Sequence, residues 1–135
     1  MTGLDKICSD LLKEVAAVRG VVVVNLKTRH LMAAAYNTAH FDQNYLDTLV
    51  EATVDMFQGE TVKNANAQLS AQRGEKVDNI IQELQVATGD TCYFMAVIPE
   101  KPENVLVLVT GKKTNLGVGW AAVQKTLPRV TAYCS

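Results

Sequence analysis

The apolar positions at the start of the chain change from a helical spacing to a strand spacing. Apolar side chains recur three and four positions apart from Leu4 to Val18, which predicts an amphipathic helix that Gly20 ends. A valine run within Val21–Asn25 and a second apolar run, Leu31–Ala35, follow with a short polar link, as in a β-hairpin. Because the valines are apolar at successive positions, we expect their strand to be covered on both faces and to lie inside the sheet.

The middle of the chain predicts a second helix that begins after Asp42. Asp42 is a favourable N-cap residue, and Phe41 before it is placed to pack on Leu46 as a hydrophobic staple. Apolar residues continue at helical spacing to Phe57. Residues 61–73 are polar with scattered apolar positions, and they fit either a further, ragged helix or a loop.

The remaining chain is rich in strands. Asn79–Ala87 and Thr91–Val97 flank a turn sequence, and Val105–Thr110 follows a loop that contains two prolines. A last helix is predicted to end at Pro128, and its apolar face comprises Leu116, Trp120, Val123 and Leu127. Since Asn79–Ala87 has only one strand neighbour in sequence, we expect it to form an edge of the sheet.

The order helix, two strands, helix, three strands, helix indicates the fold class. Hairpins dominate this order, so we predict an α+β fold with a five-stranded antiparallel sheet that the helices cover. The chain has 135 residues, a length that fits one domain, 1–135, with a core from about residue 4 to 127 and a short C-terminal tail.

Composition and charge narrow the class of protein. The chain is 48% hydrophobic and 20% charged with a net charge of −1, and it has no concentrated basic patch, so we expect no nucleic-acid partner. The N-terminal residues do not resemble a signal peptide, and the longest apolar runs are only strand-sized, so we expect no membrane insertion. Three widely spaced cysteines fit a reducing compartment, and the predicted location is the cytoplasm.

The stretch from Val105 to Gln124 contains glycines and lysines that invite comparison with phosphate-binding loops. A P-loop ending at Gly111-Lys112 requires glycine where Leu106 stands and serine or threonine where Lys113 stands. A dinucleotide-binding motif built on Gly117 and Gly119 would need a second parallel strand, for which the chain after Ala122 is too short. We therefore expect these glycines to serve close packing, with Gly117 and Ala121 forming a stripe of small residues on the last helix.

Catalytic chemistry has no clear candidate in the sequence. His30 and His40 have no sequence neighbours that would complete a metal site or a catalytic triad, and Cys92 lies in an apolar run typical of a buried residue. We therefore predict a non-enzymatic protein with no catalytic residue, no metal site and no cofactor.

The second predicted helix offers two candidate surfaces. Asp47, Glu51 and Asp55 recur every four residues and form an acidic stripe, which is either a solvated face or a contact surface for a basic partner. The apolar part of the same helix is wide enough to suggest burial against both its own sheet and another subunit. With the edge strand, it predicts a homodimer interface that comprises Leu49, Val50, Thr53, Phe57, Ile80, Gln82 and Leu84.

Five segments together resemble the roadblock/dynein light-chain family: the first amphipathic helix, VVVVNLKTRHLMAAA, the second helix, DTCYFMAV and VLVLVTGKKTNLGVGWAAV. The most specific piece is Asn115-Leu116-Gly117, which opens the last helix directly after the fifth strand. The chain is most similar to bacterial and archaeal single-domain members related to the gliding-motility GTPase regulator. It departs from the family pattern at Leu26–His30, which replaces a glycine-containing turn, and in the length of residues 58–77.

The resemblance implies a profilin/roadblock-like α/β/α sandwich, with the first and last helices on one face of the sheet and the second helix on the other. It also implies a homodimer that regulates or scaffolds a Ras-like small GTPase, and we expect the acidic stripe to contribute to that contact. The alternative function is a small-ligand sensor or interaction module of similar fold without a GTPase partner.

Overall fold

The valine run lies in a strand that has a neighbouring strand on each side, β2 (His30–Tyr36) and β5 (Asn104–Gly111).

The structure is a computed structural model and describes residues 3–15, 18–37, 41–75, 81–113 and 115–133. Its elements, in chain order, are α1 (Gly3–Glu14), β1 (Val18–Asn25), β2 (His30–Tyr36), α2 (Gln43–Gln58), α3 (Glu60–Arg73), β3 (Glu83–Ala87), β4 (Thr91–Val97), β5 (Asn104–Gly111) and α4 (Leu116–Thr131).

The five strands form one antiparallel sheet in the order β2-β1-β5-β4-β3. Successive side chains of a strand point to opposite faces, so the valines divide between two cores. Val21 and Val23 face the core under α1 and α4, whereas Val22 and Val24 face the core under α2. All four are fully buried, which confirms that this strand is covered on both sides.

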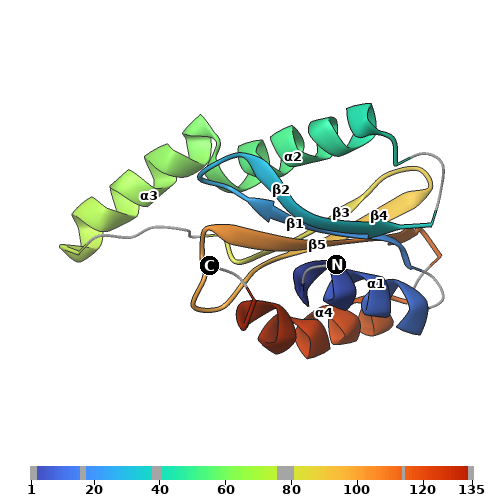
Figure 1. The fold of residues 1–135 in the computed structure, drawn as a ribbon. Helices are drawn as coiled ribbons and strands as arrows, with labels where there is room; N and C mark the ends of the chain where they lie inside the picture. The colour runs from blue at the N-terminus through green and yellow to red at the C-terminus, as the bar shows by residue number, and fades with distance from the viewer. Residues whose placement is uncertain (1–2, 16–17, 38–40, 76–80, 114, 134–135) are drawn as a thin grey trace.

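The helices lie in two layers, one on each face of the sheet (Figure 1). α1 and α4 cover one face and contact each other, and α2 covers the opposite face. This is the predicted α+β arrangement of five antiparallel strands between helical layers. None of the helices within the described residues combines the length and the apolar character needed to cross a bilayer.

Residues 60–73 form a complete helix, α3, which settles the choice between a helix and a loop. Gly59 separates α2 from α3, and a Cβ atom at this position would collide with the backbone carbonyl of Asp55. α3 contains no buried residue, contacts α2, and extends beyond the sheet (Figure 1). The fold therefore has four helices in the described residues rather than three.

The predicted end of the first helix is wrong. α1 ends at Glu14, and both Val18 and Gly20 belong to β1. A Cβ atom on Gly20 would overlap the ring of Phe41, so glycine serves there to admit this aromatic side chain rather than to cap a helix. The second helix begins as predicted, because the Asp42 carboxylate accepts a hydrogen bond from the Tyr45 amide at 2.8 Å.

The predicted end of the last helix is also wrong, since Pro128 lies inside α4. The start is correct: the side-chain oxygen of Asn115 accepts hydrogen bonds from the amides of Gly117 and Val118. Gly117 is exposed and so is Ala121, so the predicted packing stripe is wrong. Close packing instead involves Gly119, where a Cβ atom would lie 2.5 Å from the tip of the Phe94 ring.

The third strand is shorter than predicted and forms one edge of the sheet, as expected. β3 begins at Glu83, while Asn79 and Ile80 lie outside the described residues. Gln82, just before it, still accepts a backbone hydrogen bond from Val97 at 2.9 Å. β3 pairs only with β4, so its outer side has no strand neighbour in the part of the chain that is described.

Candidate partner-binding surface

The acidic stripe lies on the exposed side of α2. Asp47, Glu51 and Asp55 are all exposed, as the i, i+4 spacing predicts. Gln43 donates a hydrogen bond to Asp47 at 2.7 Å, and Arg29 forms an ion pair with Glu51 at 3.1 Å. Of the three carboxylates of the stripe, only that of Asp55 has neither a hydrogen bond nor an ion pair within the described residues, so the negative charge of the stripe is partly compensated.

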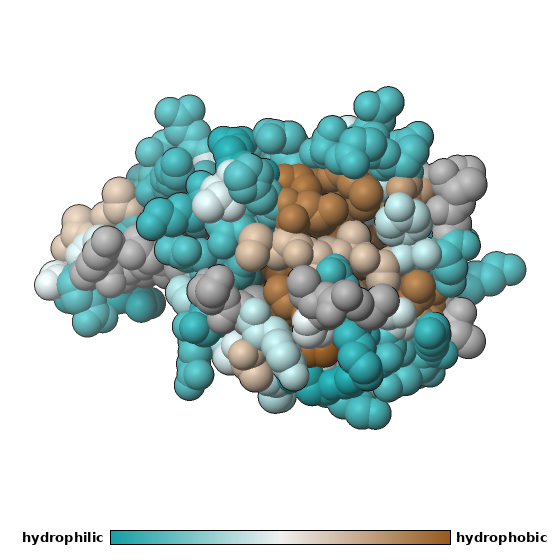
Figure 2. Space-filling view, in the orientation of Figure 1, coloured by the Kyte–Doolittle hydropathy of each residue, from teal (hydrophilic) through white to brown (hydrophobic). Residues whose placement is uncertain are grey.

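The stripe borders a groove of about 530 Å³ between α2 and the start of β2. Leu31, Leu46 and Val50 form the apolar part of its lining, and charged or polar groups line the remainder. Figure 2 shows apolar atoms at the surface just below α2. An apolar floor beside carboxylates suits a partner that presents an apolar side chain flanked by basic groups.

Arg29, the partner of Glu51, lies in a turn with an unusual backbone conformation. It has φ 60°, a left-handed value that is uncommon for a residue with a side chain. The turn around it is held by Asn25, whose side-chain oxygen accepts hydrogen bonds from the amides of Lys27 and Thr28. This turn therefore presents the Arg29 guanidinium to Glu51 of α2.

The residues predicted for a dimer interface lie in two different environments. Leu49, Val50, Thr53 and Phe57 are 6%, 6%, 0% and 2% exposed, because they pack on the chain's own sheet. Gln82 is exposed and Leu84 is half-buried, whereas Ile80 lies outside the described residues. The four helix residues thus leave little surface for contact with another subunit.

A second, apolar groove lies beside α2, between this helix and the β3 edge. Its volume is about 210 Å³, and it is lined by Tyr45, Thr48, Leu49, Ala52 and Met56 of α2 with Val86, Tyr93 and Met95 of the sheet. Sequence reasoning missed this groove, although Thr48, Ala52 and Met56 recur every four residues. This repeat consists of a threonine, an alanine and a methionine, and a search for strongly apolar residues at helical spacing does not find it.

The tyrosines at one end of this groove are bonded to each other. The hydroxyls of Tyr45 and Tyr93 lie 2.8 Å apart and link α2 to β4. Burial, and then the hydrogen bond to Tyr93, raise the pKa of Tyr45 above its usual range, so its phenol is neutral at physiological pH. The hydroxyls satisfy each other and leave the rest of the groove apolar.

The histidines and cysteines considered as catalytic or metal-binding residues form no such site within the described residues. His30 is exposed at the start of β2, Cys8 and Cys92 are buried, and His40 and Cys134 lie outside the described residues. No cluster of three or more metal-ligating side chains occurs in the described ranges.

Comparison with solved structures identifies the fold. MglB from Myxococcus xanthus superposes with a TM-score of 0.70 at 19% identity, over 96% of this chain and 86% of that one. The chain has the roadblock fold. A Roadblock/LC7 domain from Streptomyces avermitilis gives a TM-score of 0.69 at 13% identity, over 96% and 95% of the two chains. An MglB in a tetrameric arrangement gives 0.70 at 17% identity, over 96% and 86%. No family model and no curated protein matches the sequence.

Proposed function

We propose that this chain is a non-enzymatic, homodimeric regulatory module that binds a Ras-like small GTPase in the cytoplasm. The observation that carries the proposal is the roadblock fold with two distinct surfaces on α2, an acidic groove on the β2 side and an apolar groove on the β3 side. The sequence resemblance to the family of the gliding-motility GTPase regulator supports the same assignment.

The homodimer forms through the apolar groove and the β3 edge. The apolar groove exposes groups that are unfavourable in water, and next to it the β3 edge, unpaired within the described residues, offers free backbone N–H and C=O groups for pairing with another strand. A two-fold contact would cover the groove with the partner's Thr48, Ala52 and Met56 and pair the two β3 strands. The solved MglB in a tetrameric arrangement shows that a similar chain assembles.

The oligomeric state tests this interface. At micromolar concentration the wild type is expected to elute as a dimer by size exclusion with light scattering, and Ala52→Glu is expected to be monomeric. Gln68→Glu places the same charge on exposed α3 and should remain dimeric. A monomeric wild type, or an unchanged dimer in Ala52→Glu, would refute the interface.

The GTPase binds along the acidic groove, and Asp47, Glu51 and Asp55 contribute to the contact. The GTPase carries the nucleotide and the hydrolytic residues, and this chain stabilises one conformation of its switch loops. Charges at the margin of such a contact mainly raise the association rate and set specificity, so the effect should weaken with added salt.

A binding assay against the small GTPases of the source organism, each loaded with GDP or a GTP analogue, tests the contact. Replacement of all three carboxylates by lysine should weaken binding to the cognate GTPase by at least about tenfold. A control with Glu75, Asp90 and Glu100 replaced by lysine has the same change in net charge at other exposed positions. Equal affinity of the two variants would exclude the acidic stripe as the contact.

A further inference from the structure

Two exposed lysines and two exposed apolar residues lie close together in sequence, between the end of β5 and the first turn of α4. Lys112 and Lys113 form no ion pair or side-chain hydrogen bond with another described residue. Leu116 and Val118 are 48% and 51% exposed. Since large apolar side chains and unpaired cations together are typical of contact surfaces, this segment is a candidate for a partner that has carboxylates beside an apolar surface.

Arg19 adds a third positive charge to the segment. A Cβ atom on Gly111 would lie 3.1 Å from the Arg19 guanidinium, so this side chain lies beside the end of β5. Asp90, whose backbone carbonyl accepts a hydrogen bond from the Lys112 amide at 3.1 Å, offsets part of the charge. Three cations beside this one carboxylate leave a positive surface. We define the basic turn as Arg19, Lys112, Lys113, Leu116 and Val118.

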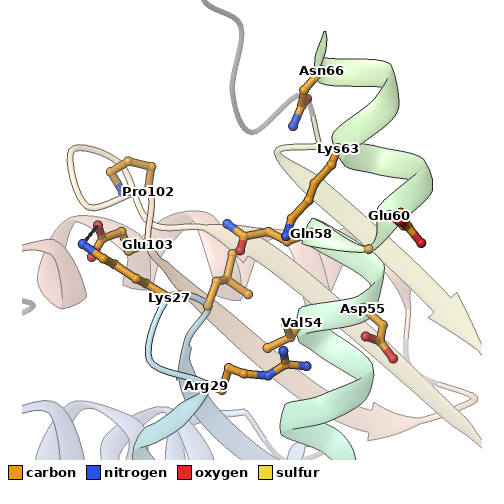
Figure 3. Close-up of a pocket in the computed structure, with 12 residues that line it drawn as sticks. Lys27, Arg29, Val54, Asp55, Gln58, Glu60, Lys63, Asn66, Pro102 and Glu103 are labelled. Atoms are coloured by element: carbon orange, nitrogen blue, oxygen red, sulfur yellow. Dashed lines mark ion pairs between the residues drawn. The ribbon is translucent and has the colours of Figure 1, made fainter. Parts of the chain in front are cut away.

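The acidic groove of α2 is complementary to the basic turn in both charge and polarity. Its floor is formed by Leu31, Leu46 and Val50, and carboxylates of the acidic stripe border it. Asp55, the carboxylate of the stripe without a partner among the described residues, also lines a cavity of about 610 Å³ where α2 meets α3. Figure 3 shows it projecting away from the space between α3 and the β4–β5 turn, so its charge is open to a partner on the outer side of α2.

The basic turn and the acidic groove of one chain lie too far apart to meet. The turn follows β5 beside the start of β1, where Thr110 pairs with Val18. The groove lies at the start of β2, where His30 pairs with Asn25 at the other end of β1. The seven residue steps of β1 between these ends span roughly 23 Å, and α4 and α2 cover opposite faces of the sheet. A contact between the two surfaces therefore joins two copies.

We propose that the basic turn of one copy docks in the acidic groove of a second copy of this chain. Leu116 and Val118 contact the apolar floor, while Lys112 and Lys113 pair with carboxylates of the acidic stripe. Because the two surfaces differ, the contact is head-to-tail, and each added copy leaves one turn and one groove free for further association. The contact is separate from the two-fold interface and does not depend on a GTPase, although a GTPase bound in the acidic groove would compete with it.

Sedimentation velocity of the Ala52→Glu chain, at several protein and salt concentrations, tests this contact apart from the two-fold interface. We expect self-association at about 20 mM salt and its loss toward about 0.5 M, because salt screens charges at the rim of a contact. Lys112→Glu with Lys113→Glu should weaken self-association at least about tenfold. Lys13→Glu with Lys125→Glu makes the same change in net charge at other exposed positions and should leave it unchanged. Equal association of the two double variants would overturn the proposal.

A mixture of two charge-reversed chains tests which surfaces meet. One chain carries Lys112→Glu and Lys113→Glu, and the other has Asp47, Glu51 and Asp55 replaced by lysine. Each should fail to associate alone, because its turn and groove then have charges of the same sign. The mixture should associate, because each turn then meets a groove of opposite charge. Circular dichroism checks that both chains are folded, and a folded pair that does not associate when mixed would contradict the proposal.

Two further arms test the apolar part of the contact and the choice of partner. Leu116→Ser with Val118→Ser should weaken self-association without changing the charge, and an unchanged association would overturn docking in the apolar floor. Cosedimentation with vesicles that contain phosphatidylserine tests an anionic lipid surface instead. Vesicle binding without self-association would assign the basic turn to lipid and reject the proposal. If Ala52→Glu does not fold, the same variants in the wild-type chain give the same test as growth beyond the two-fold dimer.

Discussion

The hydroxyl of Tyr45 on α2 lies 2.8 Å from the hydroxyl of Tyr93 on β4. The pair is the polar end of an otherwise apolar groove, and it connects the helix to the sheet beside the β3 edge. Each hydroxyl satisfies the other, so the pair helps to fix the position of α2 over the sheet. The same helix carries the acidic stripe on its outer side, and its position therefore affects both proposed surfaces.

Removing either hydroxyl should destabilise the fold to a similar extent. Tyr45→Phe and Tyr93→Phe are each expected to lower the free energy of unfolding by about 1 kcal/mol, because each breaks the same hydrogen bond and leaves one hydroxyl unpaired. The double variant should cost no more than either single one. Urea denaturation of all four proteins measures this cycle, and additive losses would show that the hydroxyls act independently.

The raised pKa of Tyr45 predicts a loss of stability at alkaline pH. The folded state favours the neutral phenol of Tyr45. The contribution of this phenol to the free energy of unfolding is therefore fully present below about pH 10, the ordinary pKa of tyrosine. The contribution is lost as the pH rises from there toward the folded-state pKa. Between about pH 9 and pH 11, the wild type should therefore lose more stability than Tyr45→Phe. Parallel pH profiles for the two proteins would contradict this.

Strand positions were predictable because buried strands have a distinctive composition. Thr91–Val97 was predicted with the bounds that the structure has, and Val105–Thr110 lies within β5. The helix ends were harder. Val18 belongs to β1, but it stands at the position where the next apolar residue of α1 would be expected. Spacing alone cannot distinguish such a strand residue from a residue of the helix. Gly20 was misinterpreted because its reason, the ring of Phe41, lies far along the chain.

A methyl group at Gly119 should be unfavourable. It would lie 2.5 to 2.8 Å from three carbons of the buried Phe94 ring, so Gly119→Ala is expected to cost about 1–3 kcal/mol despite the better helix propensity of alanine. Gly89→Ala is the matched control, since a Cβ atom there has open space. Thermal denaturation should show a lower midpoint for Gly119→Ala alone. Equal midpoints would mean that Phe94 moves aside freely.

Pro128 should weaken α4. A proline inside a helix lacks the amide that would bond the carbonyl four residues earlier, here that of Gln124, and its ring crowds that carbonyl. Pro128→Ala is therefore expected to stabilise the fold by about 1–3 kcal/mol, and Lys125→Ala on the exposed side should change it little. Chemical denaturation compares the two variants. A destabilised Pro128→Ala would indicate that the proline's own packing outweighs the missing hydrogen bond.

A candidate surface was predictable from the sequence only where all of its residues lie on one helix. The acidic stripe follows from spacing within α2, and the structure exposes all three carboxylates. The Arg29–Glu51 pair joins residues 22 positions apart and depends on a left-handed turn, and Tyr45 and Tyr93 are 48 positions apart. Contacts of this kind arise from tertiary packing, which local spacing does not encode.

Breaking the Arg29–Glu51 pair should change stability very little. Both side chains are more than half exposed, and solvent-exposed pairs contribute about 0–1 kcal/mol. Glu51→Gln should therefore unfold within about 1 kcal/mol of the wild type in low and high salt, as measured by urea denaturation. A larger loss would mean that the pair holds Arg29 in its left-handed conformation. If the stability of Glu51→Gln is unchanged, any weaker binding of a partner by this variant can be attributed to the altered surface of α2 and not to a loss of folding.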